Sequence, residues 1–125
     1  MHLALMITNA ILAVLFLYAG GTKLVVSKAS LLARDGMAWA ADYSEPALKA
    51  IGLAEVLGAI GLVVPLLTGI VPFLAPIAAV GLFLVMLGAA QVHRRRREPL
   101  LLPTTLAALT LVSLWLGLGV NGVTG

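Results

Sequence analysis

The sequence predicts an all-α integral membrane protein in which four transmembrane helices form a bundle with antiparallel neighbours. Hydrophobic residues make up 62% of the 125 residues and charged residues only 10%, whereas soluble domains average about half and about a quarter. The apolar residues gather in four segments of about 20 residues, the length that crosses a bilayer. A soluble domain of this size could not bury so much apolar surface.

We expect a single four-helix transmembrane domain over residues 1–125. Its spans are expected at about residues 3–26, 47–67, 72–93 and 100–118. The first apolar segment follows no basic region and precedes no convincing cleavage site, so we expect it to be retained as a span and not removed as a signal peptide.

Prolines and glycines mark the boundaries of the other spans. Three prolines lie at or just inside the expected helix starts, at Pro46, Pro72 and Pro103. A proline in the first turn removes only an N–H group that has no intrahelical partner. Thr68-Gly69 supplies a turn between the second and third spans, and Asn121-Gly122 ends the fourth. Pro65 and Pro76 lie near span ends, where we expect local kinks at most.

The segment at residues 27–46 is the longest polar stretch, and we expect it to lie at the membrane–water interface. Apolar and aromatic residues alternate there with charged ones. Trp and Tyr rings, here Trp39 and Tyr43, are favoured at that interface. A plain surface loop is the alternative.

All eight basic residues flank or fill two of the connections. They are Lys23, Lys28, Arg34 and Lys49 around the first connection, and Arg94, Arg95, Arg96 and Arg97 in the third. Basic residues mark the cytoplasmic side of a span. We therefore expect residues 27–46 and 94–99 to be cytoplasmic and both termini to lie outside, in a multi-pass protein of the inner cell membrane.

The composition also excludes several functions. The chain has no cysteine, which rules out disulfides, thiolate metal sites and thiol–disulfide chemistry. No histidine pair offers a metal site, and His2 and His93 fall at opposite membrane faces, which excludes a haem held by both. The run at residues 94–97 is better explained as a topology signal than as a nucleic-acid site, so we expect no nucleic-acid partner.

Glu55 is the clearest candidate for function, because ionisable side chains inside a span are rare and usually functional. It lies about 12 Å into the second span at 1.5 Å per residue. Gly52 and Ala59 share its helix face at spacings of three and four residues, so this face should point into the bundle. Lys23 lies toward the same membrane side on the first span, and its long side chain can reach Glu55.

Further side chains converge on this half of the expected bundle. His93 ends the third span there and joins Glu55 and Lys23 as a candidate catalytic residue. The expected lining of a pocket around them consists of Phe16, Gly20, Gly52, Ala59, Gln91, Thr104 and Trp39. Two interpretations stay open: a buried ion pair that only fixes helix register, or a pocket in which Glu55 contacts a lipophilic ligand.

Three motifs cover most of the first three spans. They are Ala19-Gly20-x-x-Lys23-Leu24, Gly52-x-x-Glu55-Val56-x-Gly58-Ala59-x-Gly61-Leu62-x-x-Pro65, and Leu74-Ala75-Pro76-x-Ala78-Ala79-x-Gly81-Leu82 followed by Met86-x-x-Ala89-x-x-x-His93. Together with Trp39, these motifs resemble the DoxX-like membrane proteins, and the resemblance covers nearly the whole chain.

The resemblance implies a four-helix membrane bundle and a link to redox chemistry. The name-giving member of the family is the membrane subunit of a thiosulfate:quinone oxidoreductase, and relatives are linked to membrane redox and stress-response complexes. The positions that match the family pattern are Lys23, Gly52, Glu55, Gly58 and His93. Our first hypothesis is an accessory subunit that binds a lipophilic molecule, such as a quinone or another lipid, in a membrane redox complex. No other cofactor is evident.

Two alternatives stay open. In the first, the protein is a small membrane enzyme doing acid–base chemistry on a lipophilic substrate, with Glu55 as proton carrier, Lys23 as its electrostatic tuner and His93 as a shuttle. In the second, it is a non-catalytic scaffold whose small-residue faces pack against partner helices. These faces are Gly52, Gly58 and Ala59 in one span and Ala78, Ala79 and Gly81 in the next. The expected partners are therefore the lipid bilayer, redox subunits or further copies of the chain.

Overall fold

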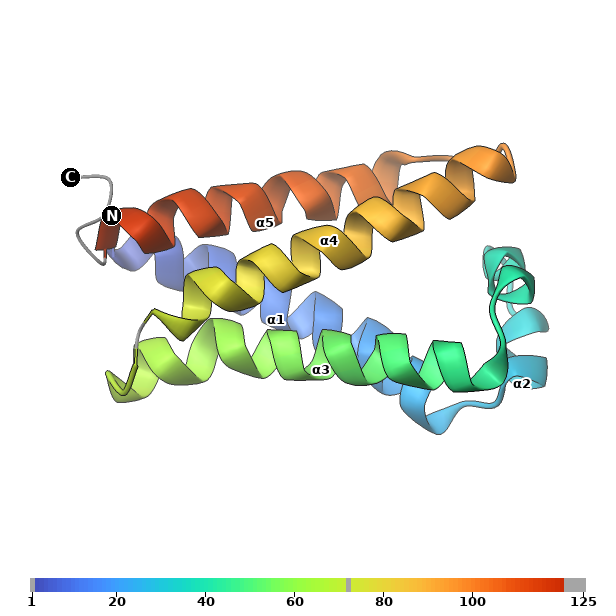
Figure 1. Ribbon diagram of the computed structural model, residues 1–125, viewed down its shortest axis with the longest axis horizontal. Coiled ribbons are helices and arrows are strands. Elements are labelled where there is room, and N and C mark those ends of the chain that lie inside the picture. The colour runs from blue at the N-terminus through green and yellow to red at the C-terminus, as the bar shows by residue number, and fades with distance from the viewer. Residues whose placement is uncertain (1, 72, 121–125) are drawn as a thin grey trace.

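A computed structural model describes residues 2–71 and 73–120 and shows a bundle of four long helices. In chain order these are α1 (His2–Val25), α3 (Glu45–Thr68), α4 (Leu74–Arg95) and α5 (Leu101–Val120). Consecutive long helices run antiparallel (Figure 1), and α1 also packs against α5, which closes the bundle. The predicted fold class is confirmed, and no helix end lies more than two residues from its expected position.

The predicted start and stop signals are found at most helix ends. Ser44 caps α3 by accepting a hydrogen bond from the Ala47 N–H (3.2 Å), and Pro46 lies in the first turn. Gly69 ends α3 in the left-handed conformation (φ 70°), which glycine adopts without strain. Two of the expected signals, Pro72 and Asn121-Gly122, lie outside the described residues.

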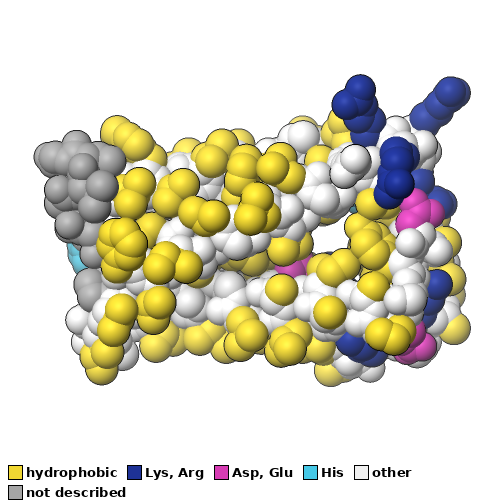
Figure 2. Space-filling view, in the orientation of Figure 1, with side chains coloured by type: hydrophobic (Ala, Val, Ile, Leu, Met, Phe, Trp, Pro, Cys, Tyr) yellow, Lys and Arg dark blue, Asp and Glu magenta, His cyan; other side chains and the backbone are white. Residues whose placement is uncertain are grey.

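The outside of the bundle is apolar along most of its length (Figure 2). Between 28% and 39% of the residues in each span are buried inside the protein, so most side chains face outward. Large exposed hydrophobic residues occur on every long helix, including Leu3, Leu57, Leu84 and Leu102. Because the helices also have the length of a bilayer crossing, this is a multi-pass membrane protein.

The segment between α1 and α3 covers one end of the bundle. It contains α2 (Lys28–Leu32) and the 3₁₀ helix η1 (Ala38–Asp42). Leu31 and Ala40 of this segment are buried against Leu48 of α3. Charged side chains gather at the same end (Figure 2), which we call the charged end; it comprises residues 23–49 and 93–98.

Candidate functional site

Two glycines bring α1 and α3 into backbone contact near the charged end. A Cβ atom added to Gly20 would lie 2.6 Å from the Gly52 carbonyl oxygen, and one added to Gly52 would lie 2.8 Å from the Gly20 carbonyl oxygen. Real Cβ atoms do not approach that closely, so only glycine allows this crossing. Lys23 and Glu55 each follow one of these glycines by three residues, and the crossing therefore places them opposite each other.

Lys23 and Glu55 form a buried ion pair. The Lys23 Nζ lies 2.7 Å from the Glu55 Oε1, and the two residues are only 8% and 1% exposed. A charge buried this deeply needs a partner, since an isolated ion would lose its hydration without compensation. Glu55 Oε1 is therefore the oxygen that receives the Lys23 ammonium, and the two opposite charges compensate each other inside the bundle.

Trp39 of η1 provides an aromatic cover beside this pair. Its ring centroid lies 5.4 Å from the Lys23 Nζ, within cation–π range. The ring also lies 6.0 Å from the His93 ring and meets the Tyr43 ring edge-on at 6.0 Å. Burial is the main cause that raises the pKa of the Tyr43 phenol. The segment between α1 and α3 thus places two aromatic rings at the charged end of the bundle.

A further set of charges joins η1 to the end of α4. The Arg96 guanidinium lies 2.8 Å from the Asp42 carboxylate and 3.6 Å from that of Glu98. Glu98 in turn lies 3.3 Å from the His93 Nδ1. These groups are partly exposed, so each pair contributes little stability by itself. Their arrangement holds the segment with Trp39 against α4.

The structure brings most of the predicted site residues together. The contacts just described lead from Glu55 to Lys23, from Lys23 to Trp39, and from Trp39 to His93. Four of the predicted lining residues are buried in α1 and α3: Phe16, Gly20, Gly52 and Ala59.

Two predicted lining residues lie elsewhere. Gln91 and Thr104 are exposed, and the Thr104 hydroxyl donates to the Leu100 carbonyl within its own helix region. Within the described residues, neither side chain makes a polar contact with the ion pair, because both lie on exposed helix faces.

Sequence reasoning missed the role of Lys49, which it used only as a topology charge. The Lys49 Nζ donates to three backbone carbonyls at the end of α1, those of Lys23 (3.0 Å), Leu24 (2.9 Å) and Val26 (2.9 Å). The last carbonyls of a helix have no intrahelical donor, so a lysine from α3 supplies one. The signal available in the sequence was a lysine one turn into the helix that follows the first connection.

A second polar contact, in the other half of the bundle, was also missed. The Asn9 amide donates to the Leu62 carbonyl (2.7 Å), and the Ser113 hydroxyl donates to the Asn9 Oδ1. All of these groups are buried. The contact joins α1, α3 and α5.

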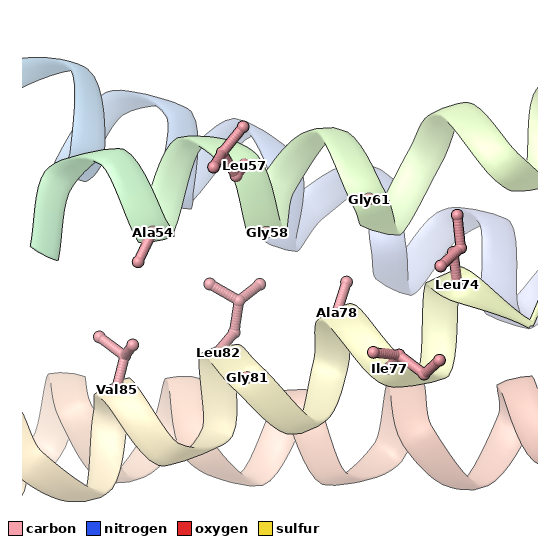
Figure 3. A pocket seen from close by; sticks show the side chains of 10 residues that line it. All are labelled: Ala54, Leu57, Gly58, Gly61, Leu74, Ile77, Ala78, Gly81, Leu82 and Val85. Carbon is pink, nitrogen blue, oxygen red and sulfur yellow. The ribbon is translucent and has the colours of Figure 1, made fainter. Parts of the chain in front are cut away.

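An apolar groove lies between α3 and α4 (Figure 3), with a volume of about 320 Å³. Its lining is Ala54, Leu57, Gly58, Gly61, Leu74, Ile77, Ala78, Gly81, Leu82 and Val85. None of these side chains is polar, and the groove opens to the outside of the bundle. Lipid, and not water, is the solvent that suits such a surface.

Comparison with known proteins gives one match. A family model described as the DoxX-like family matches residues 7–117, a range that includes the ion pair, its aromatic cover and most of each long helix. No curated protein and no solved structure matches the chain.

Proposed function

The chain belongs to the DoxX-like family, and from this premise we propose that it binds a lipophilic molecule, a quinone in class, as an accessory subunit of a membrane redox complex. The head of that molecule would lie at Lys23 and Glu55. The observation that carries the proposal is the ion pair of Lys23 and Glu55, which is buried inside membrane-spanning helices. Ionisable side chains within a membrane span are costly and usually mark a functional site.

The two side chains suit the polar groups of a quinone. The Lys23 ammonium can donate a hydrogen bond to a carbonyl oxygen, and the Glu55 carboxylate can accept one from a hydroxyl group. A quinone presents carbonyl oxygens, and its reduced form presents hydroxyl groups in the same positions. The Trp39 ring, which already lies near the Lys23 Nζ, offers an apolar face to a flat ring.

When bound, a quinone would supply the electron transfer, which no residue of this chain provides. The chain's own contribution would be to bind and orient the head group and to keep water from it. Burial of Glu55 and the cover formed by Trp39 and Tyr43 serve that purpose. A separate subunit would then pass electrons to the bound molecule.

The acid–base enzyme is less well supported. A proton shuttle from Glu55 to His93 needs donors and acceptors in sequence. Within the described residues, the side-chain contacts that lead from Lys23 to His93 pass through the Trp39 ring. An indole donates through its N–H but accepts no proton, so it cannot relay one.

The scaffold hypothesis is also less well supported, because the small residues of α3 are already in contact with other helices of the bundle. Gly52 already packs against α1, and a Cβ atom added to Gly58 would lie 2.6 Å from the Leu82 side chain. Ala59 is buried. The small residues of α3 are therefore used inside the bundle, and they do not present a free face to a partner helix.

Native mass spectrometry of the gently extracted protein tests the proposal. The unchanged chain should carry a bound small molecule, and Glu55→Gln should lose it. Glu45→Gln is the matched control, because Glu45 is exposed in the first turn of the same helix, and it should keep the molecule. Lys23→Met should also lose it, which guards against an effect peculiar to one variant.

Two results would overturn the proposal. If the intact, folded chain carries no bound molecule, the ligand-binding part of the proposal is wrong. If the chain never retains another subunit under the same extraction, even from native membranes, the accessory role is wrong.

A further inference from the structure

The groove between α3 and α4 is elongated along the helix axes. On α3 its lining runs from Ala54 to Gly61, and on α4 from Leu74 to Val85. At 1.5 Å per residue these lengths are about 10 Å and about 16 Å along the helix axes. The groove therefore runs along the bundle and has the proportions of an extended hydrocarbon chain.

The floor of the groove is closed to another helix. A Cβ atom added to Gly58 would lie 2.6 Å from Leu82, and one added to Gly61 would lie 2.9 Å from the Ala78 Cβ. Figure 3 shows these side chains of α4 pointing toward the two glycines. Helices that pack through small residues need those residues to be free, and these two glycines are covered.

One end of the groove lies at the same depth along α3 as the ion pair. Ala54 precedes Glu55 directly, and Gly58 follows it by three residues, which is less than one helical turn. The surface is hollowed between α3 and α4 toward the charged end (Figure 2). The apolar lining thus begins at the level of the polar site, and it leads away along the depth of the membrane.

We infer that this groove holds the single hydrocarbon tail of the molecule whose head lies at Lys23 and Glu55. The inference rests on the proposed function and names where the rest of the ligand lies. Its physical basis is that one amphipathic molecule matches both surfaces, a polar head for the ion pair and an apolar chain for the groove. Such a ligand enters sideways from the lipid layer and does not pass through water.

The test uses a chain in which Trp39 is the only tryptophan. Trp115→Phe gives this background, because Trp115 is exposed on α5. Quenching of Trp39 fluorescence then measures binding of two probes: a benzoquinone with a tail of two isoprene units, and the same benzoquinone without a tail.

Gly81→Leu fills the groove without disturbing the fold. A Cβ atom added to Gly81 meets nothing within 4 Å, and leucine is a better helix former than glycine. We expect this variant to weaken binding of the tailed probe about tenfold, the size of effect that one or two displaced carbon groups cause. Binding of the probe without a tail should not change.

Ala10→Leu is the matched control. It adds the same side chain to a second shallow apolar surface, formed by Ala10, Ile11, Val14 and Leu15 of α1. Both probes should bind this variant as they bind the unchanged chain.

The outcomes separate this inference from the proposed function. If neither probe quenches Trp39 in the unchanged background, the proposed function fails. If both probes bind and Gly81→Leu behaves like Ala10→Leu, only the groove assignment fails. The assignment also fails if the preference for the tailed probe persists in Glu55→Gln, which would indicate an ordinary lipid site. It fails equally if Gly81→Leu changes the oligomeric mass and leaves tail affinity intact, which would indicate a second copy of the chain.

Discussion

Lys49 of α3 donates a hydrogen bond to the backbone carbonyl oxygen of Lys23 over 3.0 Å. Lys49 thus holds the end of α1, and it is from this end that the Lys23 side chain reaches Glu55. Its two further bonds, to Leu24 and Val26, use all three donors of the ammonium group. Lys49 is thus a positioning residue for the ion pair and takes no part in the pair itself.

Lys49→Met should lower the free energy of unfolding by about 1–3 kcal/mol, because partly buried carbonyls at the end of α1 lose their donor. Thermal unfolding in detergent measures this. Lys28→Met is the control, since no described hydrogen bond or ion pair involves the Lys28 side chain, and it should change stability little. Equal losses in both variants would show that the three bonds contribute nothing specific.

The ion pair predicts strong coupling between its two members. Glu55→Gln and Lys23→Met should each destabilise the fold by about 3–5 kcal/mol, because each leaves a buried charge without its partner. The double variant removes both charges and should be more stable than the sum of the two losses implies. A double-mutant cycle measures the coupling. Additive losses would contradict a functional pairing of the two groups.

The contact between Asn9 and Ser113 should stabilise the opposite half of the bundle. Asn9→Leu should cost about 0.6–1.7 kcal/mol, the range measured for hydrogen bonds between membrane helices. Ser113→Ala should have little added effect once Asn9 is replaced. Thr8→Val serves as control, because the Thr8 hydroxyl bonds only to Ala4 of its own helix. A larger loss in Thr8→Val than in Asn9→Leu would refute this assignment.

Tyr43 predicts a pH dependence in the alkaline range. Burial raises the pKa of its phenol above the ordinary value of 10.0, so the folded chain holds this proton more tightly than the unfolded chain does. The resulting stability is complete below pH 10.0 and is lost as the pH rises through the pKa of the folded state. Tyr43→Phe should flatten this part of a plot of unfolding free energy against pH. An unchanged plot would contradict the prediction.

The expected orientation can be tested because the chain has no cysteine. Ala33→Cys and His2→Cys each add one thiol at an exposed position, at the charged end and at the start of α1. A thiol reagent that cannot cross membranes should label His2→Cys on intact cells and Ala33→Cys only after disruption. The opposite pattern would invert the assigned orientation.

The sequence predicted the four spans well because their signal is length and hydropathy, which need no knowledge of packing. The sequence also predicted that Glu55 and Lys23 lie at a similar depth in the membrane, because the 1.5 Å rise per residue determines how far each lies from the end of its helix. The position of Trp39 at the membrane–water interface stays a prediction, which rests on the preference of aromatic rings for that region. Each of these inferences uses one helix at a time.

What the sequence could not predict depends on how the helices turn toward one another. Gln91 and Thr104 lie at the expected depth but on exposed faces, because rotation about the helix axis follows from tertiary packing. Lys49 and Asn9 donate to backbone carbonyls, which every residue carries, so no sequence pattern marks the acceptor. The groove is likewise a property of two helices that diverge.

The close crossing at Gly20 and Gly52 has a consequence for how this chain can change over evolutionary time. One extra methyl group at either glycine must separate the two backbones, and that separation would lengthen the reach required of Lys23 toward Glu55. A substitution at one of the four positions is then tolerated only with a compensating change at another. Positions 20, 23, 52 and 55 should therefore vary as a single inherited unit among descendants of this sequence.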